Sequence, residues 1–140
     1  MSSFKIFDIA GSGMAAQSVR LNTVASNLAN AESVSGDPNT AYRARHPVFE
    51  AVRASVAAGQ QNDPGAAVRV SGIVESEKAP EARYEPGNPL ANAEGYIYAP
   101  NVNVVEEMVD MISASRAYQN NVEVMNTSKE LLLATLRLGQ

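Results

Sequence analysis

Residues 103–138 read NVVEEMVDMISASRAYQNNVEVMNTSKELLLATLRL and contain no proline. Asn103 followed by Glu106 is typical of a helix N-cap with a capping-box acid three residues later. Acidic residues gather at the start of the stretch, while Lys129 and Arg137 lie near its end, as the helix dipole favours. A helix over these residues would be about 54 Å long, whereas a globule of this chain length would be roughly 30 Å across. The stretch therefore predicts a long helix that one compact domain could not cover.

Apolar residues recur along this helix at heptad spacing. The expected contact stripe consists of Met108, Met111, Tyr118, Val122, Met125, Leu132 and Leu136. Such spacing indicates a helix that packs against another helix along a narrow seam. Methionine at this spacing fills packing gaps far more often than it binds a soft metal, so we interpret the methionines as packing residues.

A second proline-free stretch, residues 3–31, has a similar pattern. Its stripe consists of Phe7, Met14, Leu21, Val24 and Leu28. Most other side chains in it are small or polar, which suits a helix–helix contact better than burial in a globular core. Two glycines near its start weaken the first turns by up to about 1 kcal/mol each. Because the chain must return, we expect the two helices to pair antiparallel as a coiled coil.

The middle of the chain, residues 34–101, holds all seven prolines and reads as short strands and loops. The extended candidates are residues 40–45, 47–49, 68–70, 73–74 and 96–98, and residues 86–89 and 56–67 read as loops. Strands this short would form only a marginal core of their own. The predicted fold class is α+β, with a helix in residues 1–33, a small and mainly β outer domain in 34–101, and a helix in 102–140.

Composition excludes several classes of function. The net charge is −4 and no block of Lys or Arg occurs, which argues against a nucleic-acid partner or an anionic membrane surface. Absence of cysteine excludes disulfides, thiolate nucleophiles and cysteine-based metal sites. No run approaches the roughly 20 apolar residues of a membrane span. The first residues also lack the apolar core of a cleavable signal peptide, so we expect neither feature.

Candidate catalytic residues have stronger structural interpretations. His46 is the only histidine, and no Ser or Cys nucleophile motif accompanies it, so we expect a structural or surface role. Glu106 and Asp110 would share a helix face, but acids at a helix start are ordinary. Gly11-Ser-Gly13 lacks the third glycine of a dinucleotide fingerprint and the lysine of a P-loop. We therefore expect no catalytic residue, no metal site and no cofactor.

These observations leave two classes of function open. One is a subunit that polymerises through its terminal helices, which the long seams favour. The other is a small enzyme or ligand-binding protein that uses the middle region. A small ligand bound tightly by the monomer would favour the second class.

Several strings resemble one known family in the expected order. Residues 21–31, LNTVASNLANA, resemble the N-terminal signature of flagellar rod and hook proteins, and residues 101–126 resemble their C-terminal signature. Residues 32–36, ESVSG, 42–49, YRARHPVF, and 83–90, RYEPGNPL, resemble the proximal-rod members of that family in particular. Residues 51–67 carry no such likeness.

The resemblance implies a structural subunit of the proximal rod, the helical tube between the membrane ring and the distal rod and hook. Its terminal helices would pair around the export channel, with the β region outside. The subunit would leave the cell uncleaved through the flagellar type III export apparatus and work in the periplasmic space. Implied partners are further copies, other proximal and distal rod subunits, the rod-base adaptor and membrane-ring proteins. Another axial subunit of the rod or hook family is the nearest alternative, and a small ligand-binding protein is a more distant one.

Overall fold

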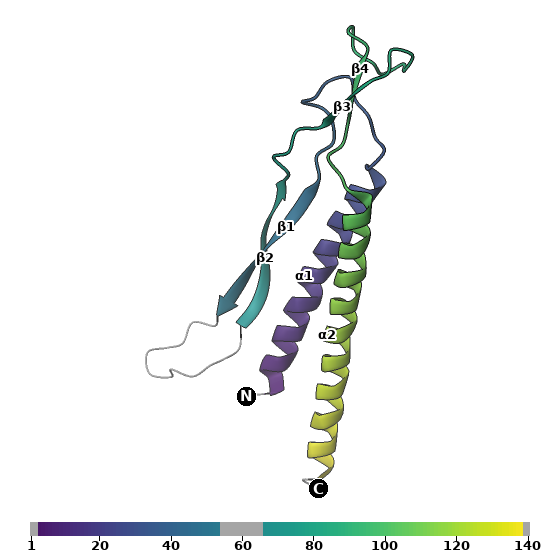
Figure 1. Cartoon of the computed structure of the whole chain (residues 1–140). Helices are drawn as coiled ribbons and strands as arrows, with labels where there is room; N and C mark the ends of the chain where they lie inside the picture. The colour runs from purple at the N-terminus through teal and green to yellow at the C-terminus, as the bar shows by residue number, and fades with distance from the viewer. Residues whose placement is uncertain (1–2, 54–65, 139–140) are drawn as a thin grey trace.

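The computed structural model describes residues 3–53 and 66–138. The elements follow in the order α1 (Ser3–Ala29), β1 (Arg45–Arg53), β2 (Ala66–Glu75), β3 (Glu81–Tyr84), β4 (Tyr96–Ala99) and α2 (Val104–Leu138). The two helices lie side by side and run in opposite directions (Figure 1). The α+β class and the expected antiparallel arrangement of the helices are confirmed, whereas supercoiling of the pair stays a prediction. Most of the expected 56–67 loop lies outside the described residues.

The start of α2 is capped as its sequence predicts. Asn103 Oδ1 accepts hydrogen bonds from the N–H groups of Val105 and Glu106, at 3.1 and 3.4 Å. The main-chain carbonyl of Asn103 accepts the N–H of Glu107 at 3.0 Å. With 35 residues α2 is about 52 Å long, and α1 with 27 residues is about 40 Å long. The C-terminal end of α2 therefore extends past α1 (Figure 1).

A two-stranded ribbon covers the side of α1 that faces away from α2 (Figure 1). In it β1 pairs antiparallel with β2 from Arg45 opposite Glu75 to Arg53 opposite Ala66, with a bulge between Val48 and Phe49. The ribbon is tied to α1 where the Val68 N–H donates to Ser12 Oγ at 3.1 Å. The helix α1 is thus the middle layer, between the ribbon and α2.

A second small sheet lies at the end of the molecule where α1 stops and α2 begins (Figure 1). It consists of β3 and β4, and an isolated bridge joins Ser35 to Tyr98 of β4. Gly36 makes this junction tight, because a Cβ there would lie 2.6 Å from the Leu90 carbonyl oxygen. Of this sheet only residues 96–98 were expected to be extended.

The predicted strands need three corrections. Residues 40–44 form no strand, because the Asp37 carbonyl accepts the N–H groups of Thr40 and Ala41 and closes a turn. His46 does not separate two extended segments but lies within β1, opposite Val74 of β2. The strand β3 was not expected: its four residues are all exposed, so no hydrophobic pattern marks it.

The molecule buries few large apolar side chains. The buried hydrophobic residues of the described chain are mainly alanines: Ala10, Ala16, Val24, Ala41, Ala44, Ile97, Ala99 and Ala114. The accessible surface is 9835 Å², whereas a compact globular protein of 14.8 kDa exposes about 7000 Å². An elongated shape with an alanine-rich core leaves apolar surface that a single chain does not cover.

Candidate assembly interface

Two polar contacts join α1 to α2 across the seam. The guanidinium Nη2 of Arg20 lies 2.6 Å from Oδ1 of Asp110, and Nδ2 of Asn27 donates to Oε1 of Glu107 at 2.9 Å. Asp110 was interpreted only as a helix-start acid, and Glu107 was one of the acidic residues expected to gather at that helix start. Both instead have partners on the opposite helix, and these contacts fix which turns of the two helices face each other.

Small residues allow the helices to approach closely. A Cβ built on Gly13 would lie 2.9 Å from Nδ2 of Asn121, so this glycine makes room for the asparagine side chain. The buried residues of α2 are Glu107, Ala114 and Ser128. Ala114 and Ser128 follow Glu107 at one and three heptads, which places the centre of the seam one residue before the series that begins at Met108.

The predicted contact residues divide into three groups. Val24 is buried, and eight are half-buried: Phe7, Met14, Leu21, Leu28, Met111, Val122, Met125 and Leu132. Met108 and Leu136 are 54% and 68% exposed, and Tyr118 is also exposed. Met108 points outward because one residue along a helix rotates the side chain by about 100°. Leu136 is exposed because it lies on the part of α2 that extends past α1 (Figure 1).

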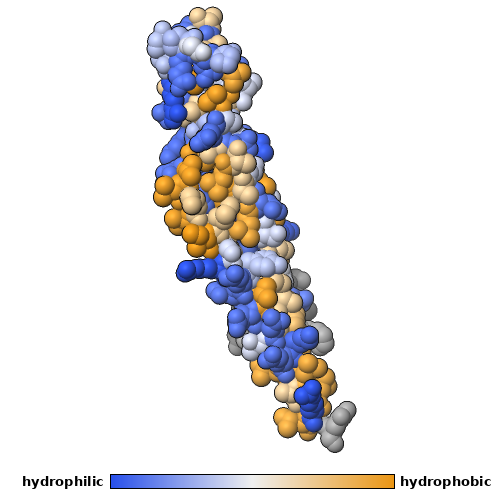
Figure 2. Space-filling view, turned by 90° about the vertical axis from the view of Figure 1, so that its right-hand side faces the viewer, coloured by the Kyte–Doolittle hydropathy of each residue, from blue (hydrophilic) through white to orange (hydrophobic). Residues whose placement is uncertain are grey.

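The side of the molecule that Figure 2 shows carries two apolar patches on α2, of which the upper one lies on the outer face of the helix, opposite the seam. The upper patch, in the first turns of α2, consists of Val105, Met108, Val109 and Ile112. The lower patch, near its C-terminal end, consists of Leu131, Leu133, Leu136 and Leu138, which point to more than one side of α2 and are exposed where this helix extends past α1. Polar surface separates the two patches in Figure 2. Exposed groups of large apolar side chains such as these mark interaction sites.

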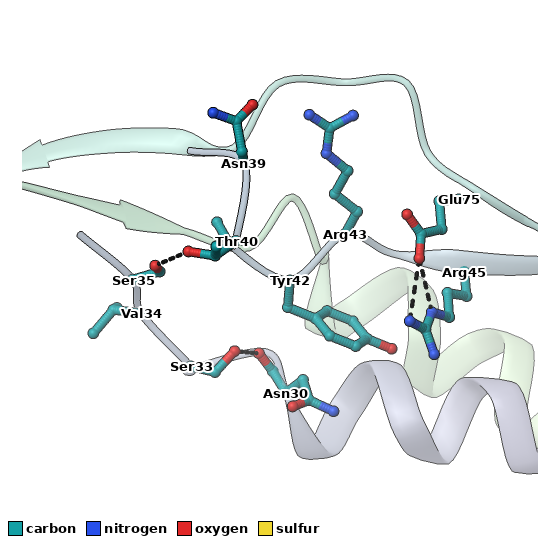
Figure 3. A pocket seen from close by; sticks show the side chains of 11 residues that line it. Asn30, Ser33, Val34, Ser35, Asn39, Thr40, Tyr42, Arg43, Arg45 and Glu75 are labelled. Carbon is teal, nitrogen blue, oxygen red and sulfur yellow. Dashed lines mark hydrogen bonds and ion pairs between the residues drawn. The ribbon is translucent and has the colours of Figure 1, made fainter. Parts of the chain in front are cut away.

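A polar pocket of about 520 Å³ lies between the end of α1 and the segment that leads into β1 (Figure 3). Its side chains largely satisfy one another: Ser35 hydrogen-bonds Thr40 at 2.6 Å, and Arg45 pairs with Glu75 at 3.1 Å. The guanidinium of Arg43 has no hydrogen bond or ion pair within the described part of the chain. Neither a nucleophile–base pair nor His46 lines the pocket. It therefore gives the ligand-binding alternative little support.

His46 is exposed on β1, and no hydrogen bond of its imidazole occurs within residues 3–53 and 66–138. We predict that His46→Ala leaves swimming motility unchanged, because an exposed side chain without partners contributes within about 0.5 kcal/mol to stability. The measurement is swimming rate on soft agar, with immunoblots of the secreted chain as the control. A non-motile strain in which this variant is exported and assembled would reopen the ligand or enzyme hypothesis.

Comparison with known proteins matches both ends of the chain to one family. Residues 7–36 match the family described as flagella basal body rod protein, and residues 93–138 match the flagellar basal body rod FlgEFG protein C-terminal family. The chain is 53% identical to flagellar basal-body rod protein FlgC of Salmonella typhimurium over 140 residues, covering all of both chains. It is 51% identical to FlgC of Yersinia enterocolitica over 140 residues and 35% identical to FlgC of Bacillus subtilis over 151 residues, again covering all of each chain.

This chain belongs to the FlgC family of flagellar basal-body rod proteins. The family is structural, so the chain is not an enzyme. The resemblance of the sequence to flagellar rod proteins is confirmed. The two matched regions take in α1 and its following turn, and β4 with α2, which are the elements that build the helix seam and the outer face.

Three further findings concern the described residues. Neither α1 nor α2 combines the length and hydropathy needed to cross a membrane. Within residues 3–53 and 66–138, no group of three or more His, Asp or Glu side chains is placed to hold a metal ion. On β3, a hydrogen bond and the negative charge of Glu81 raise the pKa of the Arg83 guanidinium, but both side chains are exposed and lie away from the seam.

Proposed function

We propose that this chain is a structural subunit of the flagellar basal-body rod and that it assembles through its terminal helices. Full-length identity to FlgC proteins supports the rod role. The observation that carries the assembly mode is the outer face of α2, whose upper apolar patch stays exposed among the described residues. The described residues thus form a helix pair in which the side of α2 that faces α1 is packed and the outer face of α2 is exposed.

Burial of the outer face would supply the free energy that one chain lacks. Each fully buried large aliphatic side chain contributes about 1.5–3 kcal/mol, so each half-exposed residue of the upper patch would add about 1 kcal/mol on burial. Only three residues of α2 are buried within the chain. Contacts with neighbouring rod subunits would therefore contribute much of the stability of the long helix.

The resemblance to proximal-rod proteins extends the proposal to the setting. Copies of this chain and other rod subunits would form a tube whose helices surround the export channel, with the strands outside. The chain would reach the periplasmic space uncleaved, through the flagellar type III apparatus. The rod-base adaptor, membrane-ring proteins and distal rod subunits would be its neighbours. Torque would pass through many small contacts spread over two helices.

We predict that the terminal helices are largely disordered in the dilute monomer and order on assembly. Ordering a residue costs roughly 1–2 kcal/mol, and α2 buries too little within one chain to offset this over 35 residues. Hydrogen exchange on the purified monomer should be fast across residues 104–136 and slower in residues 68–74 and 96–98. The same helix amides should be protected in assembled rods.

The control is analytical ultracentrifugation on the same sample, which verifies that the chain is monomeric during exchange. Strong protection across residues 104–136 in a verified monomer would contradict the prediction. The helix pair would then be stable in the monomer, and assembly would consist of docking preformed helices onto neighbouring subunits.

A further inference from the structure

Asn27 is the most connected side chain of the described chain. Its Oδ1 accepts hydrogen bonds from the Tyr42 hydroxyl and the Arg45 N–H, and its Nδ2 donates to the Arg45 carbonyl and to Glu107 Oε1, each at 2.9 Å. The side chain is 0% exposed. An amide side chain has two donor hydrogens and two acceptor lone pairs, so every hydrogen-bonding position of Asn27 is used.

These four bonds join three elements that are distant in sequence. Asn27 belongs to α1, Arg45 is the first residue of β1, and Glu107 lies in the first turn of α2. Both main-chain groups of Arg45 are held by the one amide, much as a neighbouring strand would hold them. The direction in which β1 leaves the helix pair is therefore tied to the contact between the helices.

The burial of the Glu107 side chain is not explained by a gain in local stability. The side chain is 4% exposed, Oε1 bonds Asn27, and no group of the described residues donates to Oε2. The nearby cation of the seam, Arg20, is bonded to Asp110 instead. A buried carboxylate with so few partners is costly, whereas buried polar pairs in helix seams are best known for specifying register.

A second contact agrees with this register. Gly13 faces Asn121, which lies two heptads after Glu107, and Gly13 lies two heptads before Asn27. A slip of one heptad would place Ala114 opposite Asn27 and leave its amide without the carboxylate. In that slipped register, the space left by Gly13 would also no longer lie opposite the Asn121 side chain.

We propose that Asn27 and Glu107 form a register pin. The pin selects one alignment of α1 on α2 and, through the same amide, positions the β1–β2 ribbon on the helix pair. Asn27 is thus a positioning residue for assembly: the tube contacts and the outer strands adopt their relative arrangement only when the helices pair in this register.

The test exchanges the hydrogen-bonding roles of the two side chains. Asn27→Asp sets two carboxylates against each other and should lower the number of rods per cell by about tenfold or more. Glu107→Gln keeps an acceptor for the Asn27 amide and should stay near the wild-type number. The double variant Asn27→Asp/Glu107→Gln restores a donor opposite the new carboxylate but not the bond to the Arg45 carbonyl, so it should recover assembly in large part. Asn22→Asp, on an exposed asparagine of the same helix, is the matched control and should have no effect.

Register itself can be read by disulfide formation, because the chain has no cysteine of its own. Gly13→Cys with Asn121→Cys reports the observed register, and Gly13→Cys with Ser128→Cys reports the slip of one heptad that sets Ala114 opposite Asn27. In the wild-type background only the first pair should crosslink. In the Asn27→Asp background that preference should be lost, and adding Glu107→Gln should restore it.

Three results would overturn the register pin: wild-type assembly of Asn27→Asp, equal defects in the single and double variants, or an unchanged crosslink preference in Asn27→Asp. If Asn27→Asp chain does not accumulate, the double variant alone decides the matter. Counting rods rests on the proposed function. If the proposed function is wrong, the unmodified chain will be missing from purified basal bodies. If only the register proposal is wrong, the unmodified chain will still be present in wild-type rods.

Discussion

Cells that lose this chain are expected to be completely non-motile, with basal bodies that end at the membrane ring. A tubular shaft of non-covalent subunits cannot omit one of its layers, because each layer provides the surface on which the next one assembles. The measurement combines swimming on soft agar with electron microscopy of purified basal bodies from the deletion strain.

A plasmid copy of the unmodified chain should restore both swimming and the rod, which excludes effects on neighbouring genes. His46→Ala supplied in the same way should restore them equally, since that side chain is exposed and lies outside the seam. Reduced swimming with an intact rod and hook in the deletion strain would show that the chain is an accessory component instead of a required subunit.

Ile112→Asp should abolish rod assembly almost as completely as deletion. Ile112 is 56% exposed in the upper patch, so within one chain the aspartate would remain hydrated and cost little. If a neighbouring subunit covers the patch, the new carboxylate is buried without a partner, which costs several kcal/mol at every copy of the interface. We expect rod numbers per cell to fall by about a hundredfold or more.

Gln119→Asp is the matched control, because Gln119 lies one heptad further along α2, is also exposed, and lies in the sequence between the residues of the two patches. It adds the same charge and should leave most rods intact. Secreted amounts of both variants should match the wild type, since neither change affects the described contacts of the helix pair. Normal rod numbers with Ile112→Asp would show that the upper patch stays in solvent.

Helix positions follow directly from the sequence, whereas the centre of the seam does not. Freedom from proline and the Asn103 cap define α2 almost to the residue. A search for apolar heptads placed the seam at Met108, but the chain uses Glu107 with Asn27 at that level. Hydrophobic periodicity is insensitive to such polar pairs, because a buried asparagine or glutamate counts as surface in any pattern of this kind.

The strands of the β region are also only partly predictable from the sequence. β1 could be expected in part from its branched side chains, yet its start at Arg45 is set by the Asn27 amide, a contact from a different element. β3 has four exposed residues and exists because β4 pairs with it. Tertiary contacts of this sort leave no periodic signal in the strand itself.

Electron cryomicroscopy of purified basal bodies tests the central claim most directly. The account predicts that this chain occupies the rod, with α1 and α2 in the wall of the tube, the strands outside, and the upper patch of α2 covered by a neighbouring subunit. A rod that lacks this chain, or one in which the outer face of α2 is in contact with solvent, would contradict it.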